Sequence, residues 1–71
     1  YPSTSIIINA ANEILVDQFL KKNIPFLSIN KFILDILKDV NYKKYAIKRP
    51  KNIYQILNIN DWAKKKALDR I

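Results

Sequence analysis

The chain has 71 residues, with 13 Lys and Arg against 6 Asp and Glu, so its formal net charge is +7. Hydrophobic residues make up 49% of it, which is enough for a small core. It contains no Cys, His or Gly. These absences exclude disulfides, a histidine-based catalytic site and a glycine-rich phosphate-binding loop. The composition therefore predicts a mostly helical module with little catalytic equipment.

The first predicted helix extends from about Ser3 to Lys22. Apolar residues follow helical spacing through this stretch. The hydroxyls of Ser3, Thr4 and Ser5 are candidates for capping its start. Its end is predicted at residues 21–23, because cations are favoured at the negative end of the helix dipole.

A second helix is predicted from about Ile29 to Val40, with Ser28 as its N-cap. Its apolar residues repeat at i, i+3, i+4, i+7, i+8 and i+11, which is the clearest amphipathic pattern in the chain. They are Ile29, Phe32, Ile33, Ile36, Leu37 and Val40. Asp35 and Asp39 lie on the opposite side and are interpreted as a solvated face.

Residues 41–51 are predicted to form a connector, because Pro50 breaks any helix there. A short helical turn is predicted over residues 52–57. The last helix is predicted to begin near Asn58–Asp61, with Asn60 or Asp61 as its cap, and to run toward Ile71. Three main helices and one short turn give an all-α bundle, a single domain over residues 1–71. A bundle of this size buries only about 60% of its unfolded surface, so we expect another domain or a partner to support it.

The run Asn9-Ala10-Ala11-Asn12-Glu13 is the most unusual segment. Asparagine inside a helix is locally unfavourable, because its amide competes for the backbone. An adjacent pair of alanines lets another segment approach closely. One interpretation is an ordinary polar helix face, and the other is an anchor by which the helix docks onto another domain. A metal or catalytic role for Glu13 is disfavoured, since such a site needs several converging carboxylates.

This run resembles the C-terminal region of the 1-deoxy-D-xylulose 5-phosphate reductoisomerase family. That family carries the pattern N-A-A-N-E-x-x-V-x-x-F-L, followed by I-x-F-x-x-I and a helix. The positions after the run are matched by Val16, Phe19, Leu20, Ile24, Phe26 and Ile29. The likeness is close over residues 6–29 and looser after Val40. Trp62 and the lysines at 64–66 depart from the family pattern.

The resemblance implies that residues 1–71 are the structural C-terminal domain of a larger enzyme and brace its catalytic domain. That enzyme rearranges and reduces deoxyxylulose phosphate in isoprenoid biosynthesis and is expected to be a homodimer. Its NADPH and its Mg or Mn are expected to bind outside this segment, which then holds no catalytic, cofactor-binding or metal-binding residue. The start at Tyr1 rather than Met fits a piece of a longer protein.

The composition also bears on the compartment. Ile, Asn and Lys account for 32 of the 71 residues, as the codons of an AT-rich genome would give. Together with the implied pathway, this bias predicts a plastid-like organelle such as an apicoplast if the source is eukaryotic, and the cytoplasm otherwise. No apolar run approaches the roughly 20 residues that a membrane-spanning helix needs, so no membrane is expected as a partner.

A basic stretch supports an alternative function. It consists of Lys43, Lys44, Lys48, Arg49 and Lys51, interleaved with Tyr42, Tyr45 and Tyr54. Cations neutralise phosphates and aromatic rings stack on unpaired bases, so a free-standing basic helical module that binds nucleic acid or an acidic partner stays open. A solvated linker is preferred, because no known nucleic-acid module accompanies the stretch and Lys lacks the bidentate fork of Arg. Nucleic acid is therefore not expected as a partner.

Overall fold

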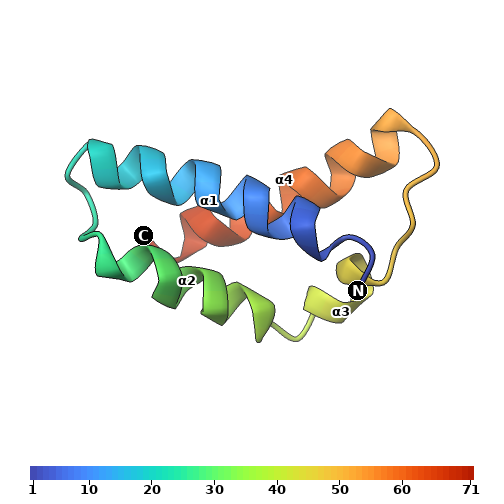
Figure 1. Cartoon of the computed structure of the whole chain (residues 1–71), viewed down its shortest axis with the longest axis horizontal. Helices are drawn as coiled ribbons and strands as arrows, with labels where there is room; N and C mark the ends of the chain where they lie inside the picture. The colour runs from blue at the N-terminus through green and yellow to red at the C-terminus, as the bar shows by residue number, and fades with distance from the viewer.

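The computed structural model describes all 71 residues, which form four helices and no strand. These are α1 (Thr4–Leu20), α2 (Leu27–Leu37), α3 (Tyr42–Ala46) and α4 (Ile53–Asp69). Figure 1 shows α1 and α4 running in the same general direction, with α2 returning antiparallel to α1 and the short α3 leading into the loop before α4. The packing of α1 is most extensive against α4. The prediction of an all-α bundle with three main helices and one short helical element is confirmed.

The short helical element does not lie where the sequence predicts it. Residues 42–46, expected to belong to a connector, form α3. This helix begins there because Asp39 holds the chain in a turn. The Asp39 carboxylate accepts a hydrogen bond from the N–H of Asn41 at 2.8 Å, and the Asp39 carbonyl accepts one from the N–H of Tyr42 at 3.0 Å. A helix of five residues is too short to show an apolar period, so periodicity could not reveal it.

The last helix is continuous from Ile53, so the predicted break between a turn and a final helix is wrong. Asn52 has an extended backbone, with φ −154° and ψ 172°. Its side-chain oxygen accepts a hydrogen bond from the N–H of Gln55 at 3.0 Å. Asn52 is therefore the N-cap, and Asn60 and Asp61 lie inside the helix.

The start of α1 is fixed by contacts with a distant part of the chain. Ser3 occupies the N-cap position, but its hydroxyl caps no helical N–H. That hydroxyl donates to the carbonyl of Lys48, and the Ser3 N–H donates to the carbonyl of Ala46 at 2.9 Å. The hydroxyls of Thr4 and Tyr42 share a hydrogen bond of 2.6 Å. The hydroxyls of Thr4 and Ser3, which were predicted to cap α1, instead connect it to α3 and to the loop that follows, and Ser5 does neither.

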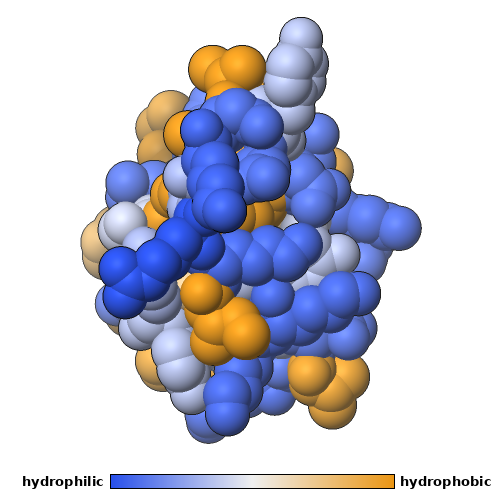
Figure 2. Space-filling model, turned by 90° about the vertical axis from the view of Figure 1, so that its right-hand side faces the viewer, coloured by the Kyte–Doolittle hydropathy of each residue, from blue (hydrophilic) through white to orange (hydrophobic).

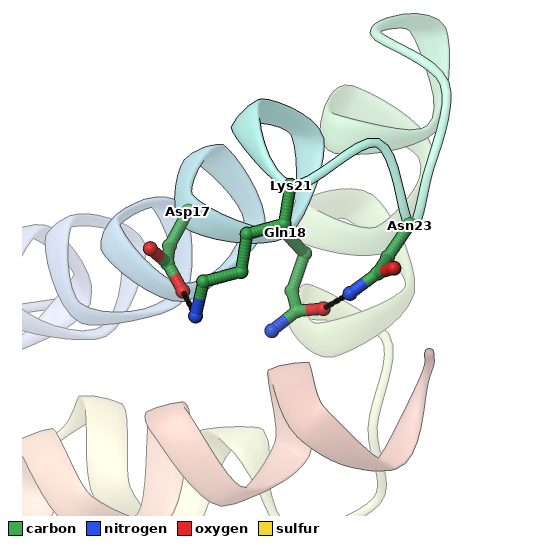
Figure 3. A network of polar contacts seen from close by, with 4 residues as sticks. All are labelled: Asp17, Gln18, Lys21 and Asn23. Carbon is green, nitrogen blue, oxygen red and sulfur yellow. Dashed lines mark hydrogen bonds and ion pairs between the residues drawn. The ribbon is translucent and has the colours of Figure 1, made fainter.

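The end of α1 is a compact turn built without glycine. Lys22 has a positive φ of 62°, the left-handed conformation that glycine usually supplies after a helix. The N–H of Asn23 returns to the carbonyl of Gln18 at 2.9 Å, and their side-chain amides form a second bond of 2.7 Å (Figure 3). Figure 3 also shows the ion pair of 2.9 Å between Lys21 and Asp17. These local polar contacts hold the turn that directs α2 back along α1.

Alanines allow the two long helices to pack closely. One buried cluster contains four alanines from the two helices, Ala10 and Ala11 of α1 and Ala63 and Ala67 of α4. Larger members of the same cluster include Ile7, Leu15, Ile36 and Ile59. Because small side chains lie where α1 faces α4, the helix axes can approach more closely than a contact of large residues would permit. The α1–α4 contact is the centre of the fold.

The second helix is shifted from its predicted position. It begins at Leu27, so Ser28 lies in its first turn and is not its cap. Ile29 and Ile36 are buried as the pattern predicts, and Phe32, Ile33 and Leu37 are half-buried. Val40 is 93% exposed, because α2 ends three residues before it. The predicted apolar stripe is therefore correct as far as Leu37.

Replacement of one core leucine tests the position of this core. Leu15 is fully buried, whereas Leu27 is 84% exposed. We expect Leu15→Ala to lower the free energy of unfolding by about 2–5 kcal/mol, because it removes buried methyl groups and leaves a cavity. The matched control Leu27→Ala should change it by less than about 0.5 kcal/mol. Urea unfolding of both variants measures the difference, and equal effects would show that the core is misplaced.

Candidate functional site

The run from Asn9 to Glu13 has two different sides on α1. Ala10 and Ala11 are buried against the core, whereas Asn9, Asn12 and Glu13 are exposed. The alanine pair does admit a close neighbour, as its sequence suggests, and that neighbour is α4. The polar residues of the run lie on the outer side of the helix.

The two asparagines have no partner inside this chain. Neither the Asn9 nor the Asn12 side chain takes part in any of its side-chain hydrogen bonds. The Glu13 carboxylate lies 3.6 Å from the ammonium of Lys64, and the Glu13 side chain is 70% exposed. An ion pair this exposed contributes less than about 1 kcal/mol. Docking of these residues onto another domain stays a prediction.

The Glu13–Lys64 pair shows which surfaces of α1 and α4 adjoin. Asn9 lies four residues before Glu13, so both are on one side of α1. Leu57 and Asn60 lie seven and four residues before Lys64, on one side of α4. Because Glu13 contacts Lys64, these two sides meet. We call the residues Asn9, Glu13, Leu57 and Asn60 the outer α1–α4 surface.

The carboxylates of the chain do not converge. No group of three or more Asp or Glu side chains is arranged to hold a metal ion. The acid nearest to Glu13 in sequence, Asp17, pairs with Lys21 at 2.9 Å. The outer α1–α4 surface therefore offers hydrogen bonds and apolar contact to a partner rather than acid–base chemistry.

Asp39 forms a polar junction that the sequence did not predict. Instead of belonging to a solvated face, its side chain is only 11% exposed. The Asp39 carboxylate accepts from Asn41 N–H and lies 3.3 Å from the ammonium of Lys66 on α4. The Asn41 N–H lowers the pKa of Asp39 and Lys66 lowers it further, while partial burial opposes both. The pairing of residues 27 positions apart leaves no local signal in the sequence.

Tyr42 and Tyr45 of the basic stretch have partners in the chain, whereas the Tyr54 side chain is 79% exposed. The Tyr45 ring stacks on Trp62, with centroids 4.6 Å apart and an angle of 13° between the planes. The ammonium groups of Lys44 and Lys48 lie 5.6 and 5.0 Å from the centroid of the Tyr45 ring. Such cation–π contacts stabilise by about 0.5–1 kcal/mol at exposed sites. Trp62 thus acts as a packing anchor for α3.

The other end of the basic stretch surrounds a cavity. The cavity has a volume of about 500 Å³ and lies between the loop that precedes α4 and the first turns of that helix. Its lining consists of Lys48, Arg49, Lys51, Asn52, Tyr54, Gln55 and Asn58. Three of these residues are cations and none is acidic. We call it the basic cavity.

Comparison with known proteins identifies the family. Residues 2–66 match the family described as DXP reductoisomerase C-terminal domain. The chain belongs to this family. The chain is 36% identical, over 97% of its length, to the apicoplastic 1-deoxy-D-xylulose 5-phosphate reductoisomerase of Plasmodium falciparum, and 41% identical, over 93%, to the reductoisomerase of Blochmanniella pennsylvanica. It spans only 14% and 15% of the lengths of these relatives. No solved structure matches it.

Membership of the DXP reductoisomerase family confirms the resemblance carried by the Asn9–Glu13 run. Two lysines that depart from the family pattern have structural partners here, since Lys64 pairs with Glu13 and Lys66 with Asp39. They connect α4 to α1 and to the turn that follows α2. None of the four helices is both long and apolar enough to cross a membrane.

The lowered pKa of Asp39 predicts a specific loss of stability in acid. Its folded-state pKa lies below the unfolded value of about 3.9. The ionised carboxylate therefore stabilises the fold above that value, and this contribution is lost as the pH falls through the folded-state pKa. We expect Asp39→Asn to flatten the fall of the melting temperature below about pH 4. The exposed residue Asp61 supplies the control Asp61→Asn, which should melt with the original pH dependence.

Proposed function

We propose that residues 1–71 form the structural C-terminal domain of a 1-deoxy-D-xylulose 5-phosphate reductoisomerase and brace its catalytic part. The observation that supports this most strongly is the family match over residues 2–66, nearly the whole chain. The chain spans only about one seventh of the length of its relatives, and in this proposal the catalytic machinery belongs to the rest of the polypeptide.

The chemistry of these residues supports a bracing role. NADPH binding in a dinucleotide-binding turn needs glycine, and the chain has none. A Mg or Mn site needs converging oxygen ligands, and the carboxylates here are dispersed. These residues fit neither group. In our proposal the enzyme binds NADPH and its divalent metal elsewhere and forms a homodimer.

The outer α1–α4 surface, together with Asn12, is the proposed contact with the catalytic part. Asn9 and Asn12 present free amides on a helix, where asparagine gives no local advantage. Leu57, on the same surface as Asn9, is an exposed apolar group. An amide that finds a partner on docking is satisfied, and leaving it buried without one would cost about 1–3 kcal/mol. These residues would fix the orientation of α1 without touching substrate or metal.

The compartment follows from the proposed identity. One relative is named apicoplastic, and the other relatives include bacterial enzymes. We propose a plastid-like organelle if the source is eukaryotic and the cytoplasm otherwise. The free-standing nucleic-acid-binding module receives less support, because Tyr45, the ring nearest the centre of the basic stretch, is already stacked on Trp62.

Activity of the full-length protein tests the function. We expect it to oxidise NADPH when 1-deoxy-D-xylulose 5-phosphate and Mg or Mn are supplied. Residues 1–71 alone should give no turnover, because they lack the carboxylate cluster and the glycine turn. Absorbance of NADPH measures both. A full-length protein without this activity, or an active 71-residue chain, would refute the proposal.

Substitution of Asn12 tests the bracing contact. Asn12→Ala should lower the melting temperature of the full-length enzyme, because a docked amide loses its hydrogen bonds. The KM values for substrate and NADPH should stay nearly unchanged. Asn30, an exposed asparagine on α2, provides the control Asn30→Ala, which should leave melting unaltered. Normal melting combined with a large loss of turnover would instead place Asn12 at the active site.

A further inference from the structure

The cations of the basic cavity are not neutralised within this chain. The three ion pairs of the structure use lysines at positions 21, 64 and 66, none of which lines the cavity. Residues 40–60 contain no Asp or Glu at all. Of the three cavity cations, only Lys48 also lies over an aromatic ring. Three like charges around one depression repel each other, and an anion placed between them lowers that energy.

Uncovered apolar side chains lie beside the cavity. Ile47, Ile53, Tyr54 and Leu57 are all large and exposed. Figure 2 looks onto this end of the molecule and shows hydrophilic residues with separate hydrophobic patches between them. Ile56 is also partly exposed, although it precedes buried Ile59 on the core-facing side of α4. A partner with both charged and apolar groups fits this surface better than a small anion, which would leave the apolar groups in water.

Three kinds of partner could supply negative charge to this surface: a second copy of the chain, nucleic acid, or the rest of the same polypeptide. A second copy docking through the same surface would bring the same cations opposite these, and like charges at an interface oppose association. Nucleic acid would supply phosphates and could stack a base on the exposed Tyr54 ring, but the aliphatic side chains of Ile53 and Leu57 fit an apolar protein surface better. About six sevenths of the length of the relatives lies outside the residues matched here. The rest of the same polypeptide is thus the partner that the surface favours.

We propose that the basic cavity receives carboxylate side chains from an acidic segment in the rest of the same polypeptide, with Ile53 and Leu57 covered by the same contact. This inference rests on the proposed function, since it requires a catalytic part to which the domain docks. It extends the contact of the outer α1–α4 surface, with which it shares Leu57, to the start of α4.

Zero-length carbodiimide cross-linking of the full-length protein tests the proposal directly. The reagent joins a lysine amine only to a carboxylate in contact with it. We expect peptides containing Lys48 or Lys51 to be joined to acidic peptides from outside residues 1–71. Mixing isotopically labelled and unlabelled protein shows whether each link lies within one polypeptide. Raising the salt to about 1 M shortens the screening length to about 3 Å and should reduce these links.

Removal of the three cavity cations tests the same contact through the stability and turnover of the full-length protein. The triple variant Lys48→Ser, Arg49→Ser and Lys51→Ser should lower the melting temperature of the full-length protein and leave its turnover nearly unchanged. The matched control replaces three exposed, unpaired lysines elsewhere, Lys31→Ser, Lys38→Ser and Lys65→Ser. It changes the net charge equally and should not lower the melting temperature. Lys48→Arg with Lys51→Arg keeps the charge, so melting should stay normal while the links disappear.

Each other outcome contradicts the proposal in a recognisable way. Links from Lys48 or Lys51 to a second copy would identify the surface as a dimer interface. Binding of a single-stranded oligonucleotide that the triple serine variant abolishes would identify a nucleic-acid site. Links to the rest of the polypeptide through Lys21 or Lys64 alone would be consistent with the bracing function, but they would show that the basic cavity is not the docking site. If no lysine of residues 1–71 links to the rest of the polypeptide, the basic cavity is not a docking point, and Asn12→Ala tests the bracing contact separately.

Discussion

The close contact between α1 and α4 is the constraint on which the other contacts depend. Alanines on both helices allow it, and larger residues such as Leu15 and Ile59 fill the core around them. Once α4 lies along α1, Lys64 reaches Glu13 and Lys66 reaches Asp39 in the turn that follows α2. The Asp39 carboxylate in turn holds the start of α3 through Asn41. The packing of α4 along α1 therefore positions both the outer α1–α4 surface and the start of α3.

Local patterns in the sequence predicted what depends on local physics. Helical spacing located α1 and the buried part of α2, and the Asn9–Glu13 run led to the correct family. The alanine pair within that run was correctly interpreted as a place of close approach. These features involve residues within a few turns of each other, where side-chain period and composition carry the information.

The errors concern contacts between distant residues. Serine is a residue type that commonly caps helices. The Ser3 hydroxyl nevertheless donates a hydrogen bond to the carbonyl of Lys48, which is 45 residues away. Asp39 was expected to be solvated, because its partner Lys66 cannot be found by helical spacing. Asn52 was missed as the cap of α4, since several asparagines and one aspartate nearby are equally good candidates in sequence. The composition of the Asn9–Glu13 run also did not predict that the Asn9 and Asn12 side chains would be exposed.

The small core gives the docking surfaces an energetic role. Five of the eleven buried apolar residues are alanines, which bury little area, while many large apolar side chains stay exposed. Hydrophobic stabilisation scales with the apolar area removed from water, so this core alone gives a modest stability. Contacts that cover Ile53 and Leu57 and neutralise the cavity cations would add to it. Coupling between two parts of one protein is reciprocal, so whatever free energy the catalytic part contributes to this domain, the domain returns to the catalytic part. In the proposed arrangement, docking therefore stabilises this domain and the catalytic part by the same coupling free energy.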